Sequence, residues 1–215
     1  ECLQSNDDYY LPTAQAGLAR ALRSIGILLS MTVPALYIAL LYYHTELLPT
    51  RMLLAIAAAQ KGVPLPPLWE TLALLIVFEI LKQAGMRTPG VIGSTMSIVG
   101  GLVLGQSAVD ARLISAPAVI IVAIAAVTGL AAPKLQSAAL TMRFVFVVCA
   151  ALFGLYGLLF GLALLLLHLC AIHSFGMPYL VNLLPRVRAH TEDRWTRVNW
   201  RNMKSRRFKS EAKRS

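Results

Sequence analysis

Long apolar runs separated by short polar segments are the main pattern along this chain of 215 residues. Residues 25–43 carry no charge for 19 positions, close to the roughly 20 that a helix needs to cross a bilayer. Three further runs, at residues 92–109, 115–132 and 144–169, have similar length and composition. The pattern predicts an all-α fold: a polytopic transmembrane helical bundle with about four spans and additional interfacial or re-entrant helices.

The segment between the first two spans is more polar. Residues 50–60 form an apolar run too short to cross, so we expect a short interfacial helix there. Residues 68–84 have nearly spanning length but contain Glu70, Glu79 and Lys82. Glu79 and Lys82 lie three positions apart, a spacing that lets them pair on one helix face. Two interpretations stay open: solvated charges on an amphipathic helix, or a polar pathway inside an assembly.

Small residues recur at every fourth position in the second span, which gives one helix face almost no side chains. In a bilayer such a face lets two helix backbones approach closely. The face fits a ring of helices around a narrow pore, and equally fits packing within one subunit. The candidate pore or helix-packing residues are Gly93, Ser94, Ser97, Val99, Gly101, Gly105 and Gln106.

The connections complete the predicted order of elements. Ser115 is expected to cap the third span and Pro117 to open it. Arg143 is expected in the loop before the last span, and Pro34 is expected to kink the first. The predicted organisation is a membrane-surface helix at 1–24, following a missing soluble region, then a transmembrane domain at 25–169 and a basic tail at 170–215.

Composition supports the membrane assignment, because 57% of the residues are hydrophobic and only 14% are charged. The net charge of +10 is concentrated in the tail, where 11 of the 20 Lys and Arg residues follow position 185. The positive-inside rule places such a tail in the cytoplasm. Anionic lipid headgroups are a compatible partner. Nucleic acid is not expected, since no recognisable nucleic-acid-binding module accompanies the charge.

Catalytic patterns are missing from the sequence: there is no nucleophile motif with its base, no Walker loop and no zinc-protease helix. His168 has only His173 nearby in the sequence, so these residues do not make a complete set of metal ligands, and no cofactor is expected. We therefore expect a protein that is not an enzyme. Channel formation, secondary transport, reception and scaffolding remain, and transport is disfavoured by the lack of an internal repeat.

Residues 63–115, with DDYY at 7–10, YYHTELLPT at 42–50 and SFGMPY at 174–179, closely resemble the membrane region of GerA-type spore germination proteins, the A subunits of germinant receptors. The resemblance implies a multi-pass protein of the spore inner membrane with a cytoplasmic C-terminus. It implies B and C receptor subunits as partners and a homo-oligomer, expected to be a pentamer, that conducts monovalent cations when nutrient binds. An accessory channel paralogue from the fifth stage of sporulation is the alternative within the family.

Overall fold

The computed structural model describes residues 12–87, 91–131, 135–174 and 177–178, without the side chains of residues 13–14, 86–87, 91–99, 102, 173–174 and 177–178. Nearly all of these residues are helical, which confirms the predicted all-α class. The helices are α1 (Thr13–Tyr42), the 3₁₀ helix η2 (Thr45–Leu47), α2 (Thr50–Gln60), α3 (Pro67–Arg87), α4 (Val91–Asp110), α5 (Ala116–Gly129) and α6 (Gln136–Ala171).

The chain packs as two compact units. One comprises residues 1–25 and 163–215, and its described part includes a two-stranded antiparallel hairpin of β1 (His173–Ser174) and β2 (Met177–Pro178). The other unit, Gly26–Leu162, contains most of the helices and all the polar contacts discussed below. The predicted basic tail lies largely outside the described residues.

In the described part of the chain, two helices are long and apolar enough to cross a membrane: residues Gln15–Tyr42 of α1, and α6. Helix α5 is also apolar but has only 14 residues, three fewer than the uncharged run from 116 to 132. Helix α4 has 20 residues and matches the predicted position of the second span. The count of four spans therefore stays a prediction.

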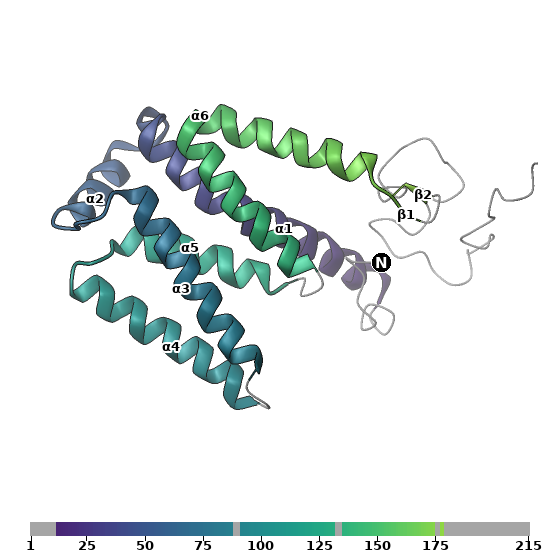
Figure 1. Cartoon of the computed structure of the whole chain (residues 1–215), viewed down its shortest axis with the longest axis horizontal. Helices are drawn as coiled ribbons and strands as arrows, with labels where there is room; N and C mark the ends of the chain where they lie inside the picture. The colour runs from purple at the N-terminus through teal and green to yellow at the C-terminus, as the bar shows by residue number, and fades with distance from the viewer. Residues whose placement is uncertain (1–11, 88–90, 132–134, 175–176, 179–215) are drawn as a thin grey trace, which may run out of the picture. The chain divides into compact units, whose positions relative to one another are not determined.

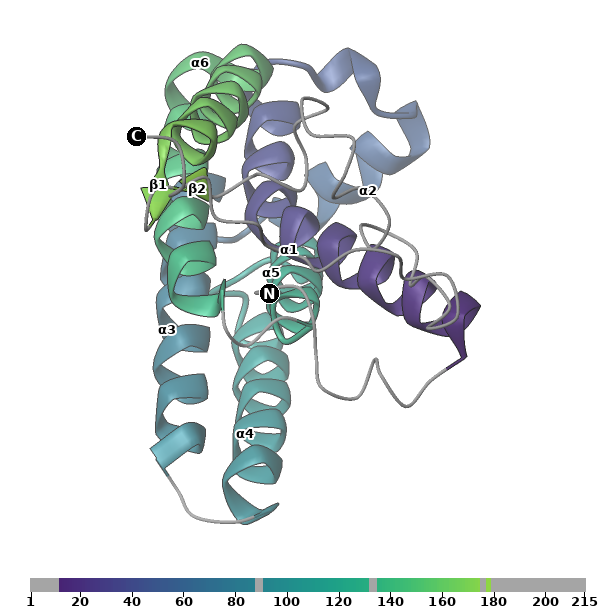
Figure 2. The same ribbon diagram turned by 90° about the vertical axis from the view of Figure 1, so that its right-hand side faces the viewer.

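Helices α3 and α4 run side by side as a hairpin, and α5 packs against α3 (Figures 1 and 2). Helix α3 begins at Pro67, where the missing proline N–H costs nothing because the first helical turn has no carbonyl partner for it. Its Leu75 is almost fully buried, whereas Ile76 and Ile80 are exposed. The segment predicted at 68–84, with its two open interpretations, is thus a 21-residue helix that packs against both α4 and α5.

Helix α6 contradicts the predicted continuous span at 144–169, because its backbone leaves the helical region at Gly154 (φ 62°, ψ −141°). Only glycine adopts such angles at little cost, so the residue permits a sharp bend within an otherwise apolar helix. Beyond the bend the chain folds back: Gly157 lies against Cys149, and Gly161 lies against the ring of Phe146. Figure 1 shows α6 as two helical stretches that meet at an angle.

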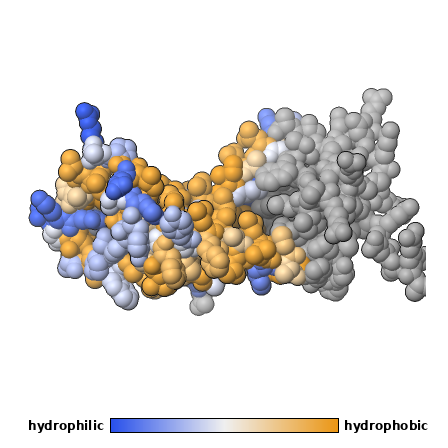
Figure 3. All heavy atoms as spheres, turned by 90° about the horizontal axis from the view of Figure 1, so that it is seen from above, coloured by the Kyte–Doolittle hydropathy of each residue, from blue (hydrophilic) through white to orange (hydrophobic). Residues whose placement is uncertain are grey.

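The interior of the Gly26–Leu162 unit is built from small and branched apolar side chains of α1, α5 and α6. Fully buried members include Ala35, Ile38, Ala39, Ala118, Ala125, Phe146, Val147 and Ala150. Many large apolar side chains remain exposed instead, and Figure 3 shows hydrophobic atoms over much of one face, interspersed with hydrophilic ones. Soluble monomers rarely expose so much contiguous apolar surface, so this surface suits contact with lipid or with other membrane helices.

Candidate functional site

The small-residue face of α4 can be followed in its second half, where two glycines contact other helices of the same chain. A Cβ placed on Gly101 would lie 3.8 Å from the ring of Phe78 in α3. A Cβ on Gly105 would lie 3.4 Å from Val119 in α5. These contacts favour the interpretation that this half packs within one subunit. Gln106 is exposed on the described surface.

The remaining candidates on that face, Gly93, Ser94, Ser97 and Val99, lie in the helical part of α4 whose side chains fall outside the described residues. Their assignment to a pore or a packing face stays a prediction.

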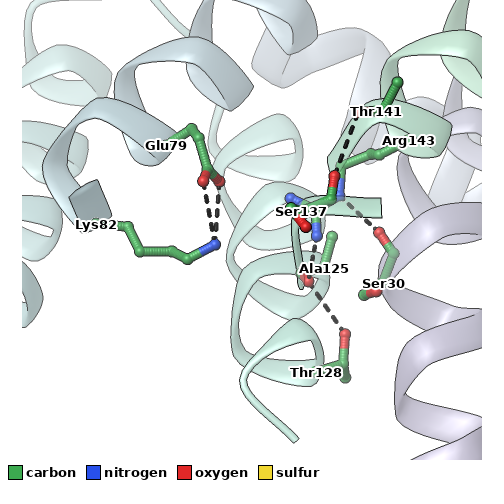
Figure 4. A network of polar contacts seen from close by, with 8 residues as sticks. All are labelled: Ser30, Glu79, Lys82, Ala125, Thr128, Ser137, Thr141 and Arg143. Atoms are coloured by element: carbon green, nitrogen blue, oxygen red, sulfur yellow. Dashed lines mark hydrogen bonds and ion pairs between the residues drawn. The ribbon is translucent and has the colours of Figure 1, made fainter. Parts of the chain in front are cut away.

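Glu79 and Lys82 form the ion pair that their spacing predicts. The ammonium of Lys82 lies 3.2 Å from both carboxylate oxygens of Glu79 (Figure 4). Their side chains are only 14% and 13% exposed, respectively, so the pair is not a solvated surface pair. This finding argues against the amphipathic-helix interpretation, in which both charges were expected to face water.

Arg143 provides the main correction to the sequence analysis, because it was expected in a loop and instead lies inside α6 with 5% of its surface exposed. Its Nε donates a hydrogen bond to the carbonyl oxygen of Ser30 at 2.8 Å. Its Nη2 donates to the carbonyl oxygen of Ala125 at 3.1 Å. One guanidinium therefore joins α1, α5 and α6 through two backbone carbonyls, as Figure 4 shows.

The Ser30 carbonyl is free to accept this hydrogen bond because α1 supplies no backbone N–H donor for it. In an α-helix the carbonyl of residue 30 would accept from the N–H of residue 34, and Pro34 has no N–H. A buried carbonyl without a donor costs free energy comparable to a lost hydrogen bond. Gly129 allows the close approach on the α5 side, since a Cβ there would lie only 3.3 Å from Nη2 of Arg143.

Figure 4 shows Glu79 and Lys82 of α3 in the same close view as Arg143 of α6. The ion pair of α3 and the buried arginine of α6 thus share one region of the interior, without a direct contact between Glu79 and Arg143 (Figure 4). We call Glu79, Lys82 and Arg143 the charged cluster. Arg143 was not among the candidate residues predicted from the sequence, although an arginine next to one apolar run and a proline inside another indicated it.

Glu70 lies apart from the charged cluster, since nine residues of helix place it roughly 13 Å from Glu79 along the axis of α3. The structure therefore does not join all three predicted pathway residues, Glu70, Glu79 and Lys82, in one group. Glu70 is fully buried in the first turn of α3. Its Oε1 accepts a hydrogen bond from the backbone N–H of Ser115, immediately before α5.

The prediction that Ser115 caps α5 is correct for the position of the residue but wrong for the hydrogen bond that its side chain was expected to make. Its residue position is correct, because α5 begins at Ala116 with Pro117 in its first turn. Its side chain, however, makes no capping hydrogen bond, and its backbone donates to Glu70 instead. The N-terminus of α5 can stabilise the Glu70 carboxylate by at most about 2 kcal/mol. Burying a carboxylate costs several kcal/mol, so this interaction offsets only part of that cost.

A polar cluster surrounds Glu70. The second carboxylate oxygen of Glu70, the hydroxyl of Tyr37, the hydroxyl of Ser115 and the amide nitrogen of Gln60 are all buried and without a hydrogen-bond partner in the described residues. Tyr37 lies close enough to Ser115, Gln60 and Glu70 to interact with each of them, although not in hydrogen-bond geometry. We call these four residues the Glu70 cluster.

The fold and these contacts define a class: a helical membrane protein that holds charged side chains within an apolar bundle. The chain belongs to the GerA family of spore germination proteins, since residues 1–208 match the family described as Bacillus/Clostridium GerA spore germination protein. No solved structure matches the chain.

Curated relatives agree with this assignment. The chain is 42% identical over 199 residues to Spore germination protein KA of Bacillus subtilis (strain 168), covering 92% of this chain and 37% of that protein. It is 38% identical over 188 residues to Spore germination protein GerLA of Bacillus cereus, covering 86% of this chain and 38% of that protein. It is 37% identical over 205 residues to Uncharacterized membrane protein YfkQ of Bacillus subtilis (strain 168), covering 94% and 40%, respectively. The chain thus spans about two fifths of the length of these relatives.

Proposed function

We propose that this chain is the membrane region of a germinant-receptor A subunit and that it takes part in spore germination. The observation that carries the proposal is the family match over residues 1–208, together with relatives whose names state a germination role. In this proposal the chain resides in the spore inner membrane with its C-terminus in the cytoplasm. It works there with B and C receptor subunits and with membrane lipids.

The mechanism we propose is a homo-oligomer, such as a pentamer, whose helices surround a path for monovalent cations that opens when nutrient binds. Charged side chains at membrane depth are rare and usually face a bundle interior or a water-filled path. The charged cluster of Glu79, Lys82 and Arg143 supports this proposal, because it places three charges within an apolar bundle. The first half of α4 supplies the small residues that a narrow ring of helices needs.

A scaffold for partner subunits is the second candidate, and one observation favours it. Gly101 and Gly105 contact Phe78 and Val119 of the same chain, so this half of the α4 face is used for packing within a subunit. A scaffold needs such rigid packing but no conducting path. An accessory channel paralogue would share the architecture of the first proposal and differ in its partners.

Oligomeric state and conductance distinguish these candidates. The full-length protein, purified in nanodiscs, is expected to give a closed ring of identical subunits by native mass spectrometry and to conduct K⁺ in planar bilayers only when the B and C subunits and the germinant are added. A monomer that conducts nothing would contradict the channel and favour the scaffold. A ring that conducts without any germinant partner would instead favour the accessory channel.

A further inference from the structure

The Glu70 cluster brings together residues from four parts of the chain. Tyr37 comes from α1, Gln60 ends α2, Glu70 is in the first turn of α3, and Ser115 precedes α5. Glu70 is 0% exposed, Ser115 1% and Tyr37 6%. Segments far apart in the sequence therefore meet around one carboxylate, and each contributes a polar atom that the described residues leave without a partner.

This arrangement differs from an ordinary helix contact. One oxygen of Glu70 already has a donor in the N–H of Ser115, which is sufficient to hold α3 against the start of α5. The other oxygen and two hydroxyls are left over. Buried polar atoms in native proteins nearly always have a partner, whether protein, water or ion, so three unpartnered oxygens near one negative charge point to a bound species.

From this geometry we infer that Glu70, Tyr37 and Ser115, with Gln60 beside them, form a binding site for a single monovalent metal cation. The free carboxylate oxygen and the two hydroxyl oxygens are hard ligands, as alkali cations require. The amide of Gln60 contributes a fourth oxygen when it is turned by 180°, because this rotation exchanges the positions of its nitrogen and its oxygen.

Charge selects the class of cation. The described cluster holds one carboxylate and no second acid, so its formal charge of −1 is balanced by one monovalent ion. Calcium takes six to eight oxygen ligands and magnesium needs a near-octahedral set, usually with more acidic groups or several waters. No group of three or more His, Cys, Asp or Glu side chains suited to a metal occurs among the residues that the structure describes, which also disfavours transition metals.

The site lies within one chain, so it adds to the proposed channel without depending on oligomerisation or conduction. Its occupancy would tie α1, α2, α3 and α5 together at one point. Binding to the folded state alone raises stability with ligand concentration, which provides a readout that requires no ion flow.

Thermal unfolding of the purified full-length protein in detergent tests the inference. Wild-type protein is compared in NaCl, KCl and choline chloride at equal ionic strength and fixed pH, since choline is too large for the site. We expect the unfolding temperature to rise with the concentration of one alkali cation and not with choline. Retention of ²²Na⁺ or ⁸⁶Rb⁺ by the same sample measures the stoichiometry, and one ion per chain is expected.

Three variants define the site. Glu70→Gln keeps an oxygen for the Ser115 N–H but removes the charge, and it is expected to abolish both the thermal shift and ion retention. Tyr37→Phe removes one oxygen only and is expected to weaken ion binding several-fold. Glu46→Gln removes an exposed carboxylate of η2 that belongs to neither cluster, and it is the matched control, expected to keep wild-type retention.

Three results would overturn the inference. Equal unfolding temperatures in alkali and choline salts would show that no cation binds. A shift that persists in Glu70→Gln would place the ion elsewhere. A wild-type stability that follows pH but not alkali concentration would show that a proton neutralises Glu70 instead.

Discussion

The side chain of Arg143 donates a hydrogen bond to the backbone carbonyl of Ser30, the carbonyl that Pro34 leaves without a helical donor. Ser30 and Arg143 lie 113 positions apart in the sequence. Pro34 removes the donor that α1 would supply to the Ser30 carbonyl, and Arg143 of α6 supplies a donor instead. A guanidinium suits this role because it offers five N–H donors in a planar fork, and a second donor reaches the carbonyl of Ala125.

Replacing Arg143 with methionine should destabilise the fold. Methionine keeps much of the length and apolar stem but donates no hydrogen bond, so the Ser30 carbonyl loses its partner. Leaving a buried acceptor unsatisfied costs about 1–3 kcal/mol. The free energy of unfolding in mixed micelles, followed by circular dichroism, measures the loss.

The same relationship predicts a partial rescue. In the double variant Pro34→Ala with Arg143→Met, the N–H of the new alanine can donate to the Ser30 carbonyl within α1. Arg143→Met should therefore cost less in the Pro34→Ala background than in the wild type. An equal cost in both backgrounds would show that the two sites are independent.

Gly154→Ala should disrupt the bend in α6 for two reasons. The backbone has a positive φ that L-residues rarely adopt, and a Cβ would lie 2.8 Å from Cγ of Tyr43. Such backbone conformations cost of order 1–3 kcal/mol, and the steric contact adds to this. Gly100→Ala is the matched control, because its Cβ would meet only Leu81 at 3.8 Å. Similar unfolding temperatures for the two variants would contradict the prediction.

Tyr43→Phe should weaken the same bend from the other side. The hydroxyl of Tyr43 donates to the carbonyls of Ala151 (2.8 Å) and Leu152 (3.0 Å), which lie just before the break. Because these bonds are exposed, the expected loss is only about 0.5–1 kcal/mol. Hydrogen exchange of the amides following Gly154 should increase, whereas exchange in α3 should stay unchanged. Faster exchange in both helices would indicate a global effect instead.

A double-mutant cycle on Glu79→Gln and Lys82→Met should give a favourable coupling of about 0.5–1 kcal/mol. Exposed helix pairs at this spacing contribute about 0.2–0.5 kcal/mol, and the low exposure of both side chains reduces solvent screening. Unfolding at low and at high salt measures the coupling. A coupling that vanishes at high salt would show that the pair is effectively solvated.

Gly101→Leu should disturb the packing of α3 against α4, because the added side chain would displace the ring of Phe78. Gly101→Ala is the control: its Cβ fits at an ordinary contact distance. In spores that carry the full-length protein, the leucine variant is expected to alter potassium release and the alanine variant to leave it near wild type. Unchanged release in both would argue against a channel whose opening requires this contact.

Some of this protein follows from its sequence alone. Apolar runs of spanning length predicted the helical membrane class, because a bilayer admits only segments that satisfy their own backbone hydrogen bonds. The spacing of Glu79 and Lys82 predicted their pair, since residues three apart share a helix face. Family membership followed from the residues of the α3 and α4 region, and the family match confirms it.

Other features were decided only by tertiary structure. Residues 144–169 are one apolar run in the sequence, yet the helix bends at Gly154. A glycine permits a bend at its position, but it does not by itself show that the chain bends there. From its neighbours in the sequence, Arg143 was assigned to a loop. Glu70 was assigned, in the same way, to a candidate polar pathway. Their actual partners, the Ser30 carbonyl and the Ser115 N–H, are backbone groups more than 40 residues away. Pro34 marks the Ser30 carbonyl as a group without a helical donor, but nothing in the sequence indicates which distant side chain will supply the donor.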